Sequence, residues 1–488
     1  MTTTTFGGFP GVRAVITPGG IAGVQVGREQ KLVLFGRADT NAGSASANDP
    51  TTIATRVDAR SKFGEKTELA LAMEDALNNG ANIDYIYGVA LDETQVLGDN
   101  GRGAAGDSTK LDDGVGRLSN DPIVEDVDDI TIEDGSNNEK TPVFRHESPP
   151  DASSVESGEV AVNPHTGEIA DPDGDSLTVD YKIADWQAAF DAADRVVNHN
   201  ETGIYCALSD TESVAAELST KVDELAPTWK LIKGIAGAQP NETNDFGEAG
   251  YDTENYDDGI NNDRMFLAGS VRIQGQTDQQ RTILGGIAGL FAGHALINPV
   301  YNDSIDGFVG VSESLSGADS DRLRTANVIP VNDERLDGGQ GLRLAGNHST
   351  SDADGWVRDF HRIRIVDQVL MIGKELGEQA VSNLMSDNLL QSLQEDYEAE
   401  LTGLVNAGLL RSSREGTLTN NNLEDNTPRE RVEESDTGRD FDARGGDDAE
   451  SRYFVEVNRQ SRDTIAIGVG FTPVGIARKV DETIVISE

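Results

Sequence analysis

The chain has 488 residues, 86 acidic and 40 basic side chains, and therefore a formal net charge of −46. That charge argues against a nucleic-acid-binding protein and against adhesion to an anionic membrane, because phosphate groups would repel it. Only 11 of the 40 cations are lysines and 5% of the residues are aromatic, a composition typical of proteins that work in molar salt. At such ionic strength the Debye length is about 3 Å, so the self-repulsion is screened. The single cysteine, Cys206, excludes an intramolecular disulfide and a cysteine-based zinc site.

The first 50 residues are rich in Thr, Gly, Ala and Ser and predict an extended arm that leads into strands. Short extended segments are expected at Val12–Ile16 and Leu32–Phe35. The N-terminus lacks a basic region followed by an apolar one, so we expect no secretory signal and a soluble protein made in the cytoplasm.

A helical pattern begins at Thr67, with Gly80 where a C′ glycine belongs, and Ile83–Leu91 then predicts a strand. Residues 100–160 carry many Asp, Glu, Ser and Gly and a single aromatic residue. They indicate either a salt-adapted surface domain of short strands or a partly flexible insertion. Val160–Tyr181 is typical of a hairpin.

From Asp185 onward, predicted helices and strands alternate, which favours an α/β layer around a mostly parallel sheet. The expected elements are, in chain order, a helix with Asp185 as N-cap, a strand at Ile204–Leu208, a helix opened by a capping box at Ser209–Glu212, strands at Leu231–Ala236 and Met265–Ile273, and a glycine-punctuated helix from about residue 278. The apolar run Ile283–Ile297 is too short for a membrane span, and we interpret it as a closely packed soluble helix.

The C-terminal third predicts two long amphipathic helices, at Trp356–Leu384 and Leu390–Leu404. After an acidic, irregular stretch, two alternating strands follow at Tyr453–Val457 and Ile465–Val469. Residues 482–488 have high β propensity but no downstream partner strand. They therefore need the edge of a sheet, in this chain or in a neighbour.

No motif nominates a catalytic, cofactor-binding or metal-binding residue, and we predict none of the three. The glycines of Gly19–Gly27 follow a proline rather than a buried strand, which favours a flexible arm over a phosphate loop. Carboxylates gather at Asp171–Asp175 and Asp245–Asp263 without the pattern of an EF-hand, so chance clusters are favoured over Ca²⁺ sites. The six histidines show no ligand spacing; they are His146, His165, His199, His294, His348 and His361. We expect His294 to be a packed core histidine inside the apolar helix and His361 to be a salt-bridge partner.

Several short motifs, in the same order along the chain, resemble those of contractile-tail sheath proteins. In the N-terminal part they are Phe9-Pro-Gly-Val12, the strand Leu32–Gly36, Phe63-Gly64 before a helix, and the strand that follows Gly80-Ala-Asn. Further on they are the small-residue helix Gly286–Gly293 with Asn298-Pro-Val-Tyr after it, Ala326-Asn-Val-Ile, the arginine-bearing segment Trp356–Asp367 and the step Leu401–Leu409. The resemblance covers roughly residues 1–95 and 200–488 and leaves out residues 100–180, and the acidic segment 411–450 is long for its position.

The resemblance implies a structural subunit, not an enzyme, that stacks as hexameric rings around a tail tube and uses no cofactor. Terminal arms of such subunits add strands to neighbouring sheets, and a heterologous interface that does not close makes a helix. Contraction would exchange one set of subunit interfaces for a larger one and drive the tube through the host envelope during genome delivery. The implied partners are further copies of the chain, the tail tube protein, and baseplate and tail terminator proteins, with no nucleic acid and no membrane insertion. The implied location is the virion tail of a virus of a halophilic archaeon, assembled in the host cytoplasm.

Contact segments are the residues that we expect to carry this function. Thr2–Ile16 and Thr483–Ser487 should supply exchanged strands, with Ile465–Val469 in the receiving sheet. Three arginines are candidates for contacts with acidic patches on the tube or a neighbour, with salt bridges on the helix surface as the alternative; they are Arg358, Arg362 and Arg364.

The predicted fold is a multidomain α+β or α/β chain with a central α/β layer, a C-terminal α+β sheath domain, extended terminal β arms and a β-rich insertion. The expected segments are an N-terminal arm (1–30), the first part of the α/β domain (31–99), an acidic outward insertion (100–182), the second part of the α/β domain (183–340), the C-terminal sheath domain (341–480) and a C-terminal arm (481–488). Three alternatives stay open: the sheath of a virus-derived contractile injection system, a salt-adapted α/β enzyme with an unrecognised site, and a calcium-dependent surface protein.

Overall fold

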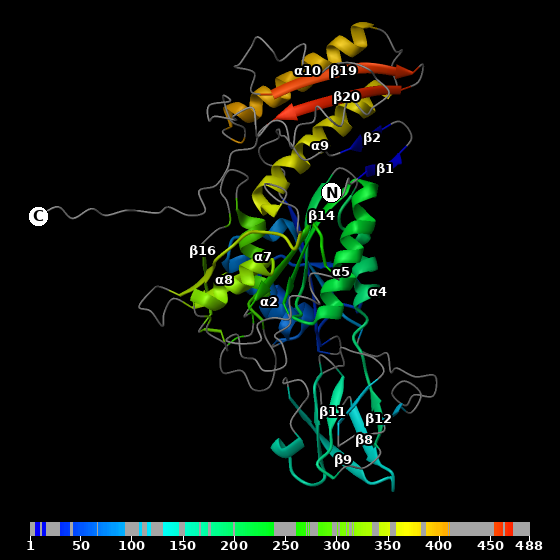
Figure 1. Cartoon of the computed structure of the whole chain (residues 1–488), viewed down its shortest axis with the longest axis vertical. Coiled ribbons are helices and arrows are strands. Elements are labelled where there is room, and N and C mark those ends of the chain that lie inside the picture. The colour runs from blue at the N-terminus through cyan, green and yellow to red at the C-terminus, as the bar shows by residue number, and fades with distance from the viewer. Residues whose placement is uncertain are drawn as a thin grey trace, which may run out of the picture.

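The structure is a computed structural model of the whole chain (Figure 1). It describes residues 5–9, 12–15, 30–39, 42–65, 67–92, 107–109, 115–118, 130–145, 152–164, 167–173, 177–198, 201–238, 260–269, 271, 273, 282–294, 300, 303–308, 310–311, 315, 317–333, 341–351, 358–381, 387–407, 409, 453–461 and 464–471. Along the long axis of Figure 1 lie a helix-and-hairpin body, a central α/β layer and a β-rich domain. The mixed α/β class predicted from the sequence is confirmed.

A nine-stranded sheet forms the central layer. Its strands, in spatial order, are β16 (Asp303–Ile305), β18 (Leu342–Leu344), β17 (Val328–Asp333), β15 (Met265–Gly269), β14 (Lys230–Gly237), β13 (Glu201–Ala207), β3 (Lys31–Gly36), β5 (Ile86–Ala90) and β4 (Thr51–Thr52). The six strands from β17 to β5 are parallel, and the edges add antiparallel pairs. The inner strands are almost continuously apolar because helices cover both faces of the sheet.

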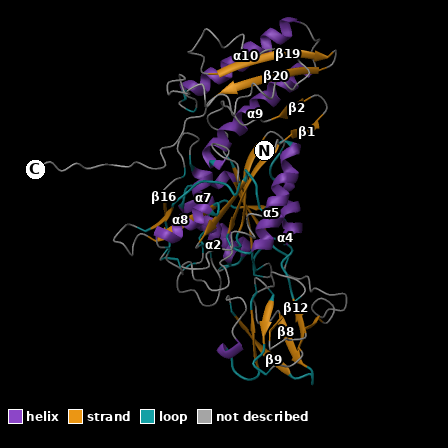
Figure 2. Ribbon diagram, in the orientation of Figure 1, coloured by secondary structure: helices purple, strands orange, loops and turns teal. Residues whose placement is uncertain are grey.

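Two sets of helices cover this sheet (Figure 2). On one face, α1 (Arg56–Phe63), α2 (Glu68–Asn78) and α7 (Leu284–Gly293) build a core with β3, β5 and β15. On the other face, α4 (Trp186–Ala192), α5 (Glu212–Leu225) and α8 (Gly317–Thr325) build a second core. The helix starts predicted at Thr67 and Asp185 are confirmed, since the Thr67 and Asp185 side chains accept hydrogen bonds from the N–H groups of Ala70 and Ala188.

Helix α7 packs unusually closely on α2, through glycines spaced four residues apart. A Cβ atom added to Gly285 would lie 2.5 Å from the Ala72 carbonyl oxygen, and one added to Gly289 would lie 2.3 Å from that of Ala76. Gly293 meets Gly80 in the same way. The interpretation of this apolar run as a closely packed helix is confirmed. Within the described ranges, no helix combines the length and the apolarity that a membrane span requires.

The β-rich domain holds a seven-stranded sheet with a core of its own. In spatial order its strands are β6 (Asp107–Thr109), β12 (Leu177–Tyr181), β8 (Ile130–Asp134), β9 (Glu139–Phe144), β10 (Glu159–Val162), β11 (Glu168–Ala170) and β7 (Val115–Arg117). The predicted hairpin over Val160–Tyr181 is wrong in part. Strands β10 and β11 form a hairpin, whereas β12 pairs with β6 and β8. A run of turn residues before Leu177 separates β11 from β12, so the chain crosses the domain instead of turning back.

The entry to and exit from this domain lie side by side, because the N–H group of Asp185 donates to the carbonyl oxygen of Asp92 at 3.1 Å. Its core consists of residues between Leu118 and Tyr181, with Ile183 at the border. Replacing residues 93–183 by a short Gly-Ser turn is therefore expected to leave the central layer folded. The expected result in molar KCl is a cooperative thermal transition within a few degrees of the wild type. Loss of that transition would show that the central layer depends on the insertion.

The C-terminal body consists of α9 (Phe360–Val381), α10 (Asp387–Asn406) and the antiparallel hairpin of β19 (Tyr453–Ser461) and β20 (Thr464–Phe471). Helix α9 starts inside the central layer, where the Phe360 ring centroid lies 4.2 Å from that of Phe291 and 5.2 Å from that of Phe266. It then leads out to α10, which lies against β19 (Figure 1). An N-terminal hairpin, β1 (Thr5–Phe9) with β2 (Val12–Val15), also lies at this end of the central layer.

Several predicted boundaries are wrong for local reasons. Residues Ile83–Tyr85 form a 3₁₀ turn capped by Asn82 before β5 begins. The capping box at Ser209 does not form, because Thr211 is the N-cap of α5 and the Ser209 hydroxyl accepts from the Thr211 N–H instead. Strand β15 ends at Gly269, and α7 begins at Leu284 rather than near residue 278. Helix α1 was not predicted, because its eight residues bury only Ala59 and Phe63.

Candidate functional site

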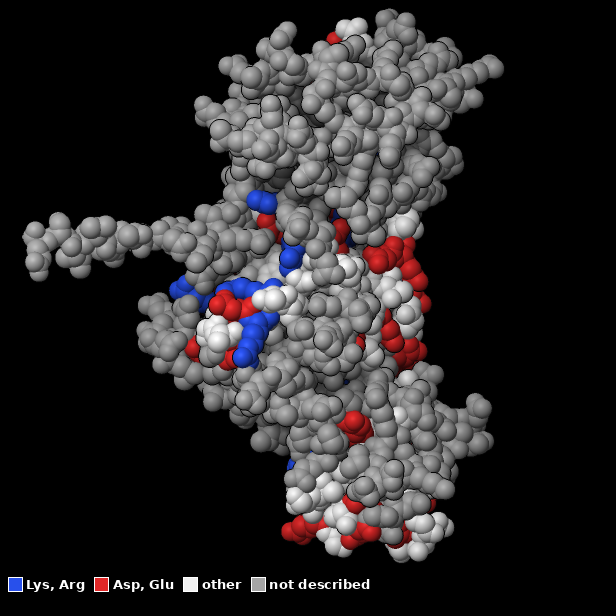
Figure 3. Space-filling view, viewed as in Figure 1, with Lys and Arg blue, Asp and Glu red and all other residues white. Residues whose placement is uncertain are grey.

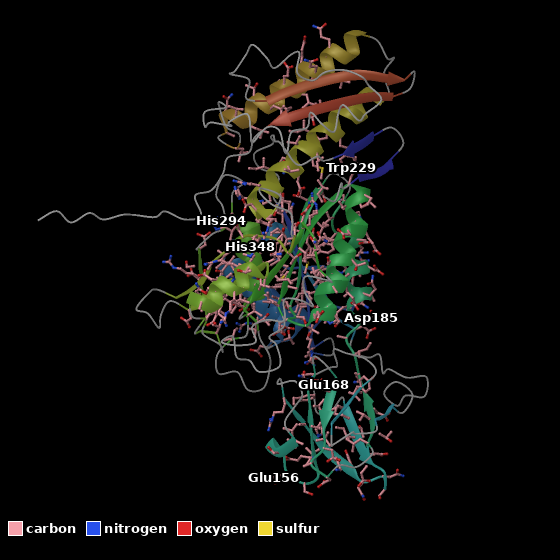
Figure 4. All side chains as sticks on the ribbon, viewed as in Figure 1. Glu156, Glu168, Asp185, Trp229, His294 and His348 are labelled. Atoms are coloured by element: carbon pink, nitrogen blue, oxygen red, sulfur yellow. The ribbon has the colours of Figure 1, made fainter. Side chains whose placement is uncertain are left out.

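The three histidines in the described part of the chain are His294, His348 and His361. His294 is not inside α7 but follows it as the C-cap residue, with its Nε2 atom 3.2 Å from the Asp303 carboxylate, so the expected core position is wrong. His348 pairs with Asp359 across an antiparallel bridge, and His361 is buried at the start of α9. Figure 4 shows His294 and His348 on the same flank of the central layer. His146, His165 and His199 lie outside the described residues. Within the described residues, no group of three or more metal-ligating side chains is brought together.

The carboxylates at Asp171 and Asp173 hold a lysine. The Lys140 Nζ atom lies 2.8 and 2.7 Å from the two Asp171 carboxylate oxygens and 3.1 Å from Asp173 Oδ2. The hydrogen bond from Lys140 is the main cause that lowers the pKa of Asp173 below its ordinary value. Because an ammonium group occupies the position in front of these carboxylates, they form an internal ion pair of the insertion. Asp175 and most of the second acidic cluster, Asp245–Asp263, lie outside the described residues.

A second buried ionic cluster fixes α9 to the sheet. The Asp367 carboxylate on α9 accepts hydrogen bonds from Arg264, which precedes β15, and forms an ion pair with Lys233 in β14. All three side chains are buried. Burial would raise the pKa of Asp367, but the charges of Arg264 and Lys233 outweigh it and hold that pKa below its ordinary value. The cluster therefore consists of one carboxylate anion between two cations, and it fixes the position of helix α9 on the sheet.

The three candidate arginines make contacts within this chain. Arg364 is buried, donates to the His294 carbonyl oxygen at 2.7 Å and lies over the Phe360 ring, so its predicted contact with the tube or a neighbour is wrong. Arg362 lies 3.2 Å from the Asp359 carboxylate, the local salt bridge given as the alternative. Arg358 is half-buried and donates to the Asn327 side chain. The start of α9 is enclosed by the central layer, which is why its arginines point inward.

Acidic side chains gather on the outer surface of α4 and α5 (Figure 3). Lys221 is buried beneath them and donates to Asp191 at 2.7 Å and to Asp194 at 3.0 Å. Burial and the neighbouring charge of Asp185 raise the pKa of Glu217, so like charges are crowded on this surface. High salt would screen that repulsion.

Open strand edges are the feature of the described residues that suits assembly. The central sheet ends in β4 and β16, of two and three residues, which are too short to template another strand. The hairpin of β19 and β20 differs, because its strands of nine and eight residues pair with no further described strand. Its two outer edges therefore offer backbone N–H and C=O groups to an added strand.

The sequence-predicted contact segments map onto these edges in part. Ile465–Val469 lies within β20, and β1 and β2 lie within Thr2–Ile16. The other expected donor, Thr483–Ser487, lies outside the described residues. The cluster of Lys233, Arg264 and Asp367 was not predicted from the sequence. Its signal was a lysine inside the apolar run of β14 and an aspartate in the apolar stripe of α9.

Comparisons with known proteins find similarity in fold alone. No protein-family model matches the chain, and no curated protein sequence matches it. The helical sheath of the anti-feeding prophage, in its contracted state, is 13% identical, with a TM-score of 0.53 over 98% of this chain and 99% of that one. The PVC sheath complex of an extracellular contractile injection system, also contracted, is 12% identical, with a TM-score of 0.51 over 99% of this chain and 98% of that one. The likeness spans nearly the full length of both proteins, and the chain has the fold of a contractile sheath subunit.

Proposed function

We propose that this protein is a structural subunit of a contractile sheath, which polymerises with further copies of itself around a tube. The observation that carries the proposal is the likeness in fold to two contracted sheaths over nearly the whole chain. The open edges of β19 and β20 support it, because strand addition joins subunits through main-chain hydrogen bonds. Such bonds survive large rigid-body movements of the domains that they connect.

In the finer form of the proposal, the subunits stack as hexameric rings around a tail tube. Contraction exchanges subunit interfaces and drives the tube through the host envelope during genome delivery, with no nucleotide hydrolysis. The partners are the tube protein, baseplate proteins and a tail terminator protein, and the sheath is part of a virion tail assembled in the host cytoplasm. The role is structural rather than catalytic. The acidic surface over α4 and α5 supports a halophilic host, because its like charges need screening by salt.

The proposed domain layout follows the same scheme. An N-terminal arm (1–30) and a C-terminal arm (481–488) flank an α/β domain in two parts (31–99 and 183–340), an outward insertion (100–182) and the C-terminal sheath domain (341–480). Strands from both arms join neighbouring copies, and Ile465–Val469 lies in the sheet that receives them.

Deleting Asp481–Glu488 is expected to leave a folded monomer that does not polymerise. The segment carries the β-branched run Ile484-Val-Ile486 and, in the proposal, completes the sheet of a neighbour. The measurement is negative-stain microscopy of the wild type and the deletion side by side in molar KCl, with circular dichroism to verify folding. A matched control exchanges Ile484 and Ile486 for valine, which keeps β propensity and should keep assembly. Cylinders of normal length from the deletion would refute the role of this arm.

A sheath of a contractile injection system is the second candidate. The two structural likenesses above both come from particles of that kind, which favours it. The two candidates differ in what the complete particle contains. Particles purified with this sheath should carry a DNA-filled head if the protein belongs to a virus, and should lack one if it belongs to an injection system.

A further inference from the structure

The β-rich domain buries a lysine directly in front of a carboxylate. Lys140 lies in β9 and Asp171 follows β11, and their side chains are 5% and 0% exposed. The Lys140 Nζ atom lies 2.8 Å from Asp171 Oδ1 and 2.7 Å from Asp171 Oδ2. The carboxyl carbon lies between those two oxygens, so it falls inside the separation of about 3.5 Å at which reacting atoms are productively placed. A nitrogen and a carboxyl carbon are therefore held within reach of each other and away from water.

Asp173 places two further groups at this pair. Its Oδ2 atom lies 3.1 Å from Lys140 Nζ, and its backbone N–H donates to Asp171 Oδ1 at 3.0 Å. The Asp173 carboxylate is itself held in place, because it accepts from the Ser157 hydroxyl at 3.0 Å and from the Gly158 N–H at 3.1 Å. The hydrogen bonds from Lys140 and Gly158 lower the pKa of Asp173, so this side chain is ionised at neutral pH. A base thus faces the amine, and an N–H donor faces an oxygen on which negative charge would develop.

The surroundings favour an uncharged link over an ion pair. Lys140 lies opposite Ile132 of β8, and Asp171 follows the buried Ala170. Taking an ammonium and a carboxylate out of water is costly, whereas an amide carries no net charge. Burial by itself would lower the pKa of Lys140, but the hydrogen bonds to Asp171 and Asp173 outweigh it and raise that pKa. The ammonium must therefore give up a proton to a neighbouring base before its nitrogen can attack.

We propose that the Lys140 and Asp171 side chains condense to an intramolecular isopeptide bond, with Asp173 as the catalytic base. Asp173 accepts a proton from the Lys140 ammonium, and the lone pair that this frees on Nζ forms a bond to the Asp171 carboxyl carbon. One C–O bond of Asp171 then breaks. Of the three ammonium protons, one stays on the amide nitrogen and two leave with the released oxygen as one molecule of water. The step needs no oxidant or reductant, and Asp173 ends as a carboxylate again.

The bond would tie together strands that are not direct neighbours. Strand β10 lies between β9 and β11 in the sheet, so the link from Lys140 to Asp171 passes across it. The link also closes a loop of the chain between positions 140 and 171. A covalent loop restricts the unfolded chain and so stabilises the folded domain. This modification goes beyond the sheath function and does not depend on it.

Lys221 offers a comparison within the same chain. It is also a buried lysine with two aspartate partners, at 2.7 Å from Asp191 and 3.0 Å from Asp194. Those two side chains are 57% and 40% exposed, and each offers one carboxylate oxygen to the lysine. Water solvates these carboxylates and no carboxyl carbon is enclosed, so we expect Lys221 to stay an ion-pair partner.

The intact mass of the protein tests the bond. Protein purified in molar KCl is unfolded in denaturant and weighed by mass spectrometry, because a covalent link survives unfolding. The wild type is expected to be lighter than its sequence by one molecule of water. Lys140→Arg keeps the positive charge but has no amine to acylate, and Asp173→Asn keeps both reacting groups but removes the base. Both variants are expected to have the full mass of their sequences, and circular dichroism verifies that they are folded.

Tryptic peptides then locate the bond. Trypsin does not cut after an acylated lysine, so residues 118–145 should stay in one piece and be joined to residues 146–182, while cleavage after Lys221 is normal. A wild type with the full mass of its sequence overturns the proposal. So does water lost as a succinimide at Asp173-Gly174, which leaves the cut after Lys140 and joins no peptides. If Asp173→Asn loses water as readily as the wild type, Asp173 is not the base. If Lys140→Arg is unfolded, the wild-type mass and peptide map decide alone.

Discussion

Replacing Gly289 by alanine is expected to lower the free energy of unfolding by on the order of 3 kcal/mol, because the added Cβ would overlap backbone. It would lie 2.3 Å from the Ala76 carbonyl oxygen and 2.6 Å from the Ala76 Cα atom. Alanine is the better helix former by about 1 kcal/mol, but that gain is smaller than the cost of separating α2 from α7. Because the clash is with backbone, shortening the Ala76 side chain to glycine should not rescue the variant. Thermal unfolding in molar KCl measures the effect.

Gly317→Ala is the matched control for this prediction. A Cβ at Gly317, the first residue of α8, meets nothing within 4 Å. This variant should unfold at the wild-type temperature or slightly above it, since alanine restricts the unfolded chain. Equal stability of the Gly289 and Gly317 variants would contradict the close α2–α7 packing.

Asp367→Ala is expected to destabilise the protein by about 3–5 kcal/mol, because it leaves Lys233 and Arg264 buried without their anion. The control is Asp321→Ala, which removes an exposed partner of Arg324 and should cost at most about 1 kcal/mol. Helix α9 carries the C-terminal body, so the variant should also assemble poorly at temperatures where its central layer is still folded. Denaturant unfolding monitored by far-ultraviolet circular dichroism measures both variants.

The loss of stability in Asp367→Ala depends on pH, because the Asp367 carboxylate can be protonated. The pKa of Asp367 is lower in the folded protein than in the unfolded chain, so its contribution is fully present above the unfolded value of about 4. That contribution is lost as the pH falls from there through the folded value. The stability gap between the wild type and Asp367→Ala should therefore narrow on acidification below about pH 4. A gap that stays constant down to pH 2 would mean that Asp367 does not bind its partners as a carboxylate.

The sequence predicted the elements whose pattern is local. Examples are the helical period of α2, the N-cap at Asp185 and the apolar runs of β13 and β14. Each pattern shows how its element packs in the layer, so the position of the element follows from the residues alone. The glycine spacing of α7 likewise identified a closely packed helix, although not its partner α2, because that contact joins residues about 210 positions apart.

The features that were not predicted from the sequence depend on contacts between segments that are distant in the chain. Lys233, Arg264 and Asp367 are ordinary residues in the sequence and become a cluster only when α9 crosses the sheet. Arg364 resembles a surface cation for the same reason, since nothing near it in the chain indicates burial. The insertion was recognised from its composition, but its strand order was not, because β6 and β7 reach the two ends of the sheet across strands that follow them in the chain.

Negative-stain microscopy of the purified full-length protein in molar KCl tests the central claim most directly, namely that a subunit completes its sheets with strands from adjoining copies. We predict rings and cylinders in molar salt. A uniform population of monomers at every salt and protein concentration, with both ends of the chain bound to their own body, would contradict it.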